Sequence, residues 1–176
     1  MARDRAAFAE FVAARSSALQ RAAYLMVGDV GLAQDLVQEA LTKTYVAWPR
    51  LRDPANAEAY TRKAITTTAI TWFRKRSWNG ERATGAVPDR ATGGHADALD
   101  VRHSLMQALA QLPPRQRAVI VLRFYEDLTE RQTAEVLGCA VGTVKSQTSA
   151  GLTKLRDLMG DELDIHDLVT SEGVLA

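Results

Sequence analysis

The feature that most constrains the fold is a pattern of helix starts and stops within residues 112–158. Thr129 precedes a helical run, and Gln132 lies three residues after Thr129. This is the spacing of a capping box, a motif that marks the beginning of a helix. Gly138 falls where that helix must stop, because glycine takes the left-handed conformation at low cost. Ala134 is small where two helices would cross closely. The pattern predicts a helix-turn-helix whose second helix spans about Val141 to Met159.

The outer face of this second helix is suited to DNA. Its apolar positions, which we expect to face inward, are Val141, Val144, Leu152 and Leu155. Hydrogen-bonding side chains remain outside on its first turns: Thr143, Lys145, Ser146 and Gln147. Side chains of this kind bind phosphates and base edges in the major groove. The alternative is an ordinary helical hairpin with a polar face.

The rest of the chain also has helical periodicity, with no alternating strand pattern. We expect helices at about 6–27, 32–48, 57–76 and 98–112, the second ended by Pro49. Residues 77–97 are rich in glycine and lack a helical stripe, which predicts a flexible linker. The expected fold is therefore all-α, with two small helical domains (1–76 and 98–160) that each have a small core, and a tail at 161–176.

Charge is segregated along the chain, although the net charge is only +1. Residues 1–76 contain twelve Lys or Arg and seven Asp or Glu, whereas residues 161–176 contain five acids and no base. Clustering rather than the total sets the local field, so the small net charge does not argue against nucleic acid as a partner.

Several other classes of function lack their signatures. Cys139 is the only cysteine, and the three histidines show no ligand spacing with it, so we expect no metal and no cofactor. The chain contains no Ser/His/Asp constellation or phosphate loop, which argues against an enzyme and a small-molecule substrate. It also lacks a membrane span and a signal-peptide core, so we expect a cytoplasmic protein that does not bind membranes.

Three motifs occur in order along the chain: AQDLVQEA at residues 33–40, LPPRQR at 112–117 and GTVKS at 142–146. Together they resemble the sigma-70 family of bacterial RNA polymerase specificity factors, and most closely its extracytoplasmic-function group. In that family they are similar to the region 2 signature, the opening of region 4 and the start of its recognition helix. The resemblance extends from about Phe8 to Met159. It implies that domain 1–76 is region 2 and that domain 98–160 is region 4.

The resemblance implies that the second helix binds core RNA polymerase through Asp35, Leu36, Gln38 and Glu39. The spacing agrees with this role, because Asp35, Gln38 and Glu39 share one helix face. Without the resemblance, a solvated face with no partner would be the preferred interpretation.

The third helix and the loop before it are implied to recognise and melt the minus-ten element. The residues concerned are Arg52, Asn56, Tyr60, Arg62, Lys63, Thr67, Thr71, Trp72, Arg74, Lys75 and Arg76. Aromatic rings mixed with cations are what capture of single-stranded DNA needs. Many relatives have Trp-Leu where this chain has Tyr60-Thr61, and Asn in place of Thr67. The alternative for Tyr60, Trp72 and Phe73 is a place in the core.

Region 4 is implied to bind the minus-thirty-five element through Arg115, Arg117, Arg131, Thr143, Lys145, Ser146, Gln147 and Lys154. Relatives often carry an arginine where this chain has Ser149-Ala150-Gly151. Gly151 lowers helix propensity by about 1 kcal/mol relative to alanine. We therefore expect weaker or differently specified recognition of this element.

The resulting hypothesis is a sigma factor that binds core RNA polymerase and promoter DNA and needs no catalytic residue of its own. Relatives are commonly regulated by a separate anti-sigma factor. The alternative is a helix-turn-helix regulator that binds duplex DNA without polymerase; such proteins usually dimerise, and the sequence shows no heptad for this.

Overall fold

The structure is a computed structural model that describes residues 2–51, 53–78 and 96–160. Every regular element within these ranges is helical, in agreement with the expected all-α fold. The elements in chain order are α1 (Ala2–Val27), α2 (Val30–Leu51), α3 (Pro54–Trp78), α4 (Ala96–Ala110), α5 (Pro114–Ile120), the π-helical turn η1 (Val121–Tyr125), α6 (Glu130–Leu137) and α7 (Val141–Met159). None of the described helices is long and apolar enough to cross a membrane.

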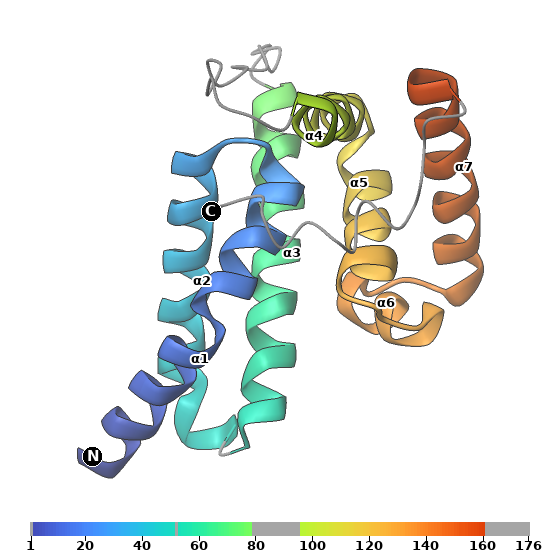
Figure 1. Ribbon diagram of the computed structural model, residues 1–176. Helices are drawn as coiled ribbons and strands as arrows, with labels where there is room; N and C mark the ends of the chain where they lie inside the picture. Colours follow the sequence, from blue (N-terminus) through green and yellow to red (C-terminus); the bar gives the residue numbers. More distant parts are fainter. Residues whose placement is uncertain (1, 52, 79–95, 161–176) are drawn as a thin grey trace.

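Helices α1, α2 and α3 form the first unit, in which successive helices run in opposite directions (Figure 1). The buried side chains of α2 recur at helical spacing and include Leu36, Val37, Ala40 and Leu41. A hydrogen bond of 2.8 Å joins the hydroxyls of Thr44 and Thr61 in the buried α2–α3 contact. The hydroxyl that accepts this bond can donate its own proton to a carbonyl of its own helix, so burial leaves neither group without a partner.

The ends of these helices differ from the expected bounds for local reasons. Gly28 has a φ of 75° and ends α1, and the Asp29 side chain then accepts a 2.8 Å hydrogen bond from the Leu32 backbone N–H as α2 begins. The prediction that Pro49 ends α2 is wrong, because the helix continues to Leu51. A proline this close to the C-terminus affects only the last turn. Helix α3 extends to Trp78, two residues into the expected linker.

Helices α4 to α7 form the second unit. In Figure 1, α5 and α6 lie beside α3, whereas α7 lies on the far side of α5. Helix α4 occupies residues 96–110, so it begins before the expected domain boundary at residue 98. Helix α5 passes directly into η1, and the backbone N–H groups of Glu126 and Leu128 bond back to the carbonyls of Val121 and Leu122.

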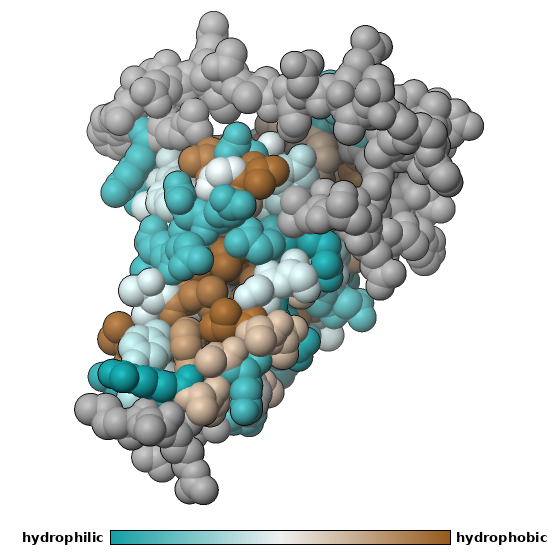
Figure 2. All heavy atoms as spheres, turned by 60° about the vertical axis from the view of Figure 1, so that its left-hand side comes forward, coloured by the Kyte–Doolittle hydropathy of each residue, from teal (hydrophilic) through white to brown (hydrophobic). Residues whose placement is uncertain are grey.

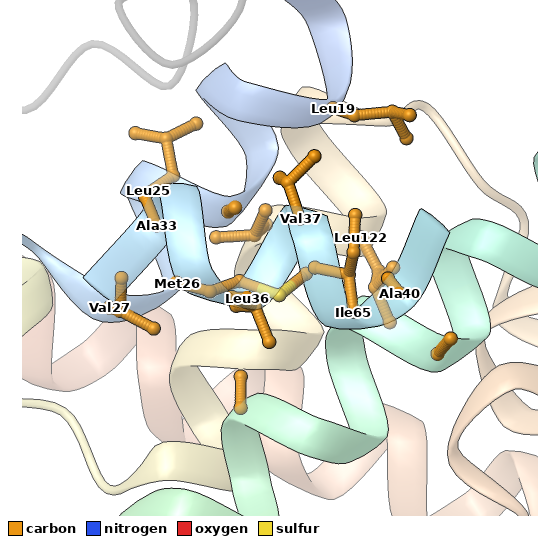
Figure 3. Close-up of a cluster of buried hydrophobic side chains, with 14 of the residues drawn as sticks. Leu19, Leu25, Met26, Val27, Ala33, Leu36, Val37, Ala40, Ile65 and Leu122 are labelled. Carbon is orange, nitrogen blue, oxygen red and sulfur yellow. The ribbon is translucent and has the colours of Figure 1, made fainter. Parts of the chain in front are cut away.

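Most of the buried hydrophobic side chains form one cluster that both units share, which contradicts the expectation of two separate cores. Val119, Ala134 and Val144 form a second, smaller cluster within the second unit. Leu122 of η1 is fully buried and lies with Leu36 of α2 and Ile65 of α3 (Figure 3). Because residues far apart in sequence make this contact, the helical periodicity of either unit could not reveal it.

Candidate partner and nucleic-acid interfaces

The expected polymerase-binding residues lie on α2. Asp35 and Gln38 are exposed, and Glu39 is half-buried beside them. The Glu39 carboxylate forms a 2.7 Å ion pair with Lys43, which also donates a 3.0 Å hydrogen bond to the Thr68 hydroxyl. The acidic patch is therefore held in place by α3. The expectation that Leu36 contacts polymerase is corrected by the structure. Its side chain is fully buried, so it packs in the core and cannot contact a partner in this structure.

An apolar recess of about 370 Å³ borders the acidic patch at Asp35. Its lining comes from α1, α2 and α3: Val27, Leu32, Asp35, Trp72, Phe73 and Lys75. The side of the molecule formed by α1 and α2 presents hydrophobic groups among hydrophilic ones (Figure 2). Sequence reasoning missed this recess, because it exists only where the ends of three helices meet.

Helix α3 carries a polar face along its length. The exposed members of the expected minus-ten set are Asn56, Tyr60, Lys63, Thr67, Arg74 and Lys75, while Thr71 is half-buried. The Thr67 and Thr71 hydroxyls donate 2.8 Å hydrogen bonds to backbone carbonyls one turn earlier, which leaves their oxygens as acceptors toward solvent. Trp72 and Phe73 are half-buried against the core, so only part of each ring is accessible. Arg52 and the side chain of Arg76 lie outside the described residues.

Arg62 belongs to the expected minus-ten set but is engaged within the protein. Its Nε lies 2.6 Å from a carboxylate oxygen of Glu126, and its Nη2 lies 3.2 Å from Glu58. The side chains of Arg62 and Glu126 are only 17% and 12% exposed. Arg62 therefore joins the two units, and in this arrangement it is not available to DNA.

A cleft of about 590 Å³ lies between α3 and α6, next to this ion pair. Asn56, Tyr60 and Lys63 line it from α3. Gln132, Glu135 and Val136 line the opposite wall from α6. The first half of the α3 polar face is thus turned toward the second unit.

The helix-turn-helix has the predicted local geometry. Thr129 and Gln132 form both hydrogen bonds of the capping box, at 2.8 and 3.2 Å. Gly138 ends α6 in the left-handed conformation, with φ 63° and ψ 42°. Ala134 is buried against Val119 and Val144, where the helices cross. These predictions are confirmed.

The start of α7 differs in one respect from the prediction. Val141 was expected to face inward, but its side chain is 37% exposed. As the first residue of the helix, it precedes the crossing at which Val144 becomes fully buried. Leu155 is fully buried as predicted, and Leu152 is half-buried.

The expected minus-thirty-five residues lie mostly on the accessible surface. Lys145, Ser146, Arg115 and Arg131 are exposed, while Thr143, Gln147 and Lys154 are half-buried. Lys145 lies 3.8 Å from Glu130 in an exposed ion pair, an arrangement that contributes little stability and leaves the cation free to rearrange. The start of α7 therefore presents donors and acceptors to solvent.

Gly151 has a packing role that its sequence context did not reveal. It is buried where α7 crosses α5, and a Cβ at this position would lie 3.0 Å from Cγ1 of Ile120. The glycine thus lets the two helix backbones approach closely. Its low helix propensity is offset by this contact between α5 and α7.

Among the residues expected to bind DNA, Arg117 departs most clearly from the prediction. Its side chain is buried, and its Nε donates a 2.7 Å hydrogen bond to the backbone carbonyl of Leu25 at the end of α1. A Cβ at Gly28 would lie only 3.0 Å from its Nη2, an atom that has no hydrogen-bond partner among the described residues. Burial lowers the pKa of the Arg117 guanidinium to about 10, an effect that the nearby Tyr24 opposes. The group remains charged at neutral pH, so its burial opposes the packing of the units.

Three residues of the inter-unit contact were absent from the sequence predictions: Leu122, Tyr125 and Glu126. The Tyr125 hydroxyl accepts a 3.0 Å hydrogen bond from Nε of Arg21. All three residues lie in or directly after the π-helical turn. Nothing in the local sequence signals their role, because their partners belong to the first three helices.

Comparisons with known proteins agree with this division into two units. Residues 11–79 match the family model described as Sigma-70 region 2, and residues 102–155 match the one described as Sigma-70, region 4. The RNA polymerase sigma-E factor of Streptomyces coelicolor is 40% identical over 170 residues, covering 94% of this chain and 93% of the relative. The ECF RNA polymerase sigma factor SigW of Bacillus subtilis is 26% identical, covering 90% and 91% of the two chains.

A solved structure also has a similar fold. It is the sigma factor RpoE of Bartonella quintana in complex with the anti-sigma factor NepR. The TM-score is 0.69 at 25% sequence identity, over 89% of this chain and 98% of the other.

Proposed function

This chain belongs to the sigma-70 family of RNA polymerase sigma factors, in its extracytoplasmic-function group, and from that premise we propose how its two units divide promoter recognition. The first unit binds core RNA polymerase and the minus-ten element, and the second binds the minus-thirty-five element. The observation that carries this proposal is the presence of three separate polar faces, on α2, α3 and α7, within units that match regions 2 and 4 in order.

The polymerase-binding surface comprises Asp35, Gln38 and Glu39 with the apolar recess beside Asp35. Carboxylates suit a partner surface that carries basic side chains, and the recess suits an apolar side chain at the centre of the contact. Leu36 contributes indirectly, because its burial fixes the rotation of α2 and so the direction of the acidic face.

The minus-ten element is recognised by the polar face of α3. Tyr60 supplies an exposed ring on which an unstacked base can stack, and Lys63 and Arg74 supply cations for the backbone. The free energy of such contacts compensates for the base pairs that are lost in the melted segment. Melting therefore needs no catalytic group or cofactor of this chain.

The minus-thirty-five element is recognised by the first turns of α7. Lys145, Ser146 and Gln147 are placed to reach base edges or phosphates, and Arg115 and Arg131 flank them as phosphate contacts. Duplex binding by the full chain should therefore weaken steeply as salt concentration rises. Residues 79–95 connect α3 to α4, and we assign them the role of a tether that lets both units contact one promoter.

The competing function is a regulator that binds duplex DNA without polymerase in the cytoplasm. Mixing the purified chain with core RNA polymerase and measuring the mass of the product distinguishes the two. The proposal predicts a one-to-one complex that survives the Lys145→Ala substitution, because α7 is not part of the polymerase-binding surface. Absence of any complex would support the regulator.

A further inference from the structure

We propose that Glu130, at the start of α6, is a positioning residue for minus-thirty-five binding, because its carboxylate competes with a DNA phosphate for the ammonium group of Lys145 on α7. The proposal rests on the function assigned to α7 above. It adds one residue to that binding surface, and it assigns Lys145 to the DNA backbone rather than to a base edge.

The crossing of α6 and α7 places Glu130 opposite Lys145. Ala134 of α6 and Val144 of α7 are buried in one cluster where the two helices cross. Glu130 lies one turn before Ala134 on the same face of α6, and Lys145 directly follows Val144. Oε2 of Glu130 consequently lies 3.8 Å from Nζ of Lys145.

The ion pair also shows which side of α7 carries Lys145. Successive residues of an α-helix are about 100° apart around its axis, so Lys145 lies on a flank next to the fully buried Val144. Ser146, one residue further around, is exposed on the outer face. When such a helix enters the major groove, its outer face meets base edges and its flanks approach the phosphates. Lys145 is therefore placed for a phosphate at the edge of the groove.

The contact between Glu130 and Lys145 is weak enough for DNA to displace. The two side chains are 39% and 63% exposed, and their separation is longer than that of a charge-assisted hydrogen bond. Lys145 has no other ion-pair partner among the described residues. A phosphate at hydrogen-bonding distance can thus replace the carboxylate, but part of the gain is lost because the ion pair must first break.

The Glu130 carboxylate also repels the phosphate that replaces it. It belongs to the first turn of α6, and the positive end of the helix dipole favours a negative charge there. The start of a helix attracts a phosphate for the same reason, so Glu130 occupies a place that suits the DNA backbone. After the ion pair breaks, the carboxylate remains beside the bound phosphate and opposes it.

This arrangement has a consequence for how the chain binds DNA. Phosphate contacts carry no sequence information, so Glu130 should weaken binding to every duplex by the same factor. A role limited to stabilising α6 gives a different expectation. In that case a neutral residue at position 130 would lower the free energy of unfolding and leave the salt dependence of DNA binding unchanged.

The test measures binding of the full chain, without polymerase, to two short DNA duplexes of unrelated sequence over a range of salt concentrations. The proteins compared are the parent, Glu130→Gln, Lys145→Ala and the variant with both substitutions. Glu135→Gln is the matched control, because Glu135 is exposed on the same helix and forms no ion pair among the described residues, but lines the cleft toward α3. Circular dichroism checks that every variant keeps the helical spectrum of the parent.

We expect Glu130→Gln to bind both duplexes roughly threefold to tenfold more tightly than the parent at low salt. The slope of log Kd against log salt concentration should become steeper by roughly 0.9, because Lys145 is then free to release one more counterion from the DNA. Lys145→Ala should abolish this gain, so it should weaken binding more in the Glu130→Gln background than in the parent. The Glu135→Gln control should stay within about twofold of the parent.

Three results would overturn the proposal: an unchanged salt slope in Glu130→Gln, a gain that persists after Lys145→Ala, or an equal gain in the Glu135→Gln control. A gain for only one of the two duplexes would contradict the assignment of Lys145 to a phosphate. If the parent binds neither duplex at low salt, the function assigned to α7 fails and the proposal fails with it. If the parent binds both duplexes and Glu130→Gln binds no more tightly, only the role of Glu130 fails.

Discussion

Glu126 lies 2.6 Å from Arg62 across the contact between the two units. Glu126 follows the π-helical turn and Arg62 lies on α3, and the side chains of both are mostly shielded from water. In this arrangement the Arg62 cation is neutralised within the protein and joins the two units.

Arg117 gives a prediction about stability. Arg117→Lys should lower the free energy of unfolding by about 2 kcal/mol, because it leaves a buried charge without the hydrogen bond to the Leu25 carbonyl. Arg117→Met should change it by less than about 1 kcal/mol, since the buried charge is removed as well. Urea denaturation of the full chain measures both, and a larger loss for Met than for Lys would contradict the role given to charge burial.

The lowered pKa of Arg117 determines the pH range in which the stability of the parent can be compared with that of Arg117→Met. Because burial brings the pKa in the folded state down to about 10, below that of the unfolded chain, the cost of burying the charged group is fully present at neutral pH. That cost declines only as pH rises above about 10. The difference in stability between the parent and Arg117→Met should thus not vary between mildly acidic and mildly alkaline buffers.

Gly151 and Gly142 should respond in opposite ways to alanine. A Cβ at Gly151 meets Ile120 at 3.0 Å, so Gly151→Ala should destabilise the protein by about 1–3 kcal/mol despite the better helix propensity. Gly142 lies in the same helix, where a Cβ would meet nothing within 4 Å among the described residues, and Gly142→Ala should stabilise by up to about 1 kcal/mol. Thermal unfolding of the two variants gives the comparison, and stabilisation by both would show that the α5–α7 crossing tolerates a side chain.

The capping box at Thr129 should contribute measurably to the second unit. Thr129→Ala removes the acceptor for the Gln132 N–H and should cost about 1 kcal/mol of stability. Ser149→Ala, at an exposed position inside α7, is the control and should have little effect. Equal effects in chemical denaturation would mean that the cap adds nothing beyond an ordinary surface substitution.

Asp35 and Glu39 should be required for binding polymerase. The pair Asp35→Ala with Glu39→Ala should weaken the complex with core RNA polymerase by roughly tenfold or more, because it removes both carboxylates of the α2 face. Glu10→Ala alters an exposed acid on α1, outside the proposed surface, and should leave the complex unchanged. Competition for core polymerase against the parent chain gives the ratio; an unaffected double variant would move the binding surface elsewhere.

Local features were predictable because a few neighbouring residues determine them. The Thr129–Gln132 capping box, the stop at Gly138 and the bounds of α7 depend on residues within one or two turns. The small crossing residue Ala134 is of the same kind. The family motifs also predicted the order of the two units along the chain.

The contact between the units was not predictable in this way. The burial of Arg117 depends on the end of α1, 92 residues earlier, and the bond between Tyr125 and Arg21 joins residues 104 apart. A motif that resembles a DNA-binding signature gives no indication that one of its arginines packs inward. Leu36 shows the same limit, because a signature does not distinguish the residues that contact a partner from those that orient the helix.

The most direct test of sigma-factor activity is to map transcripts made from genomic DNA of the source organism by core RNA polymerase with and without the purified chain. We expect discrete new start sites that depend on the chain and decline with the Asp35→Ala/Glu39→Ala pair. Absence of new start sites, together with protection of duplex DNA by the chain alone, would contradict it and favour a regulator that acts without polymerase.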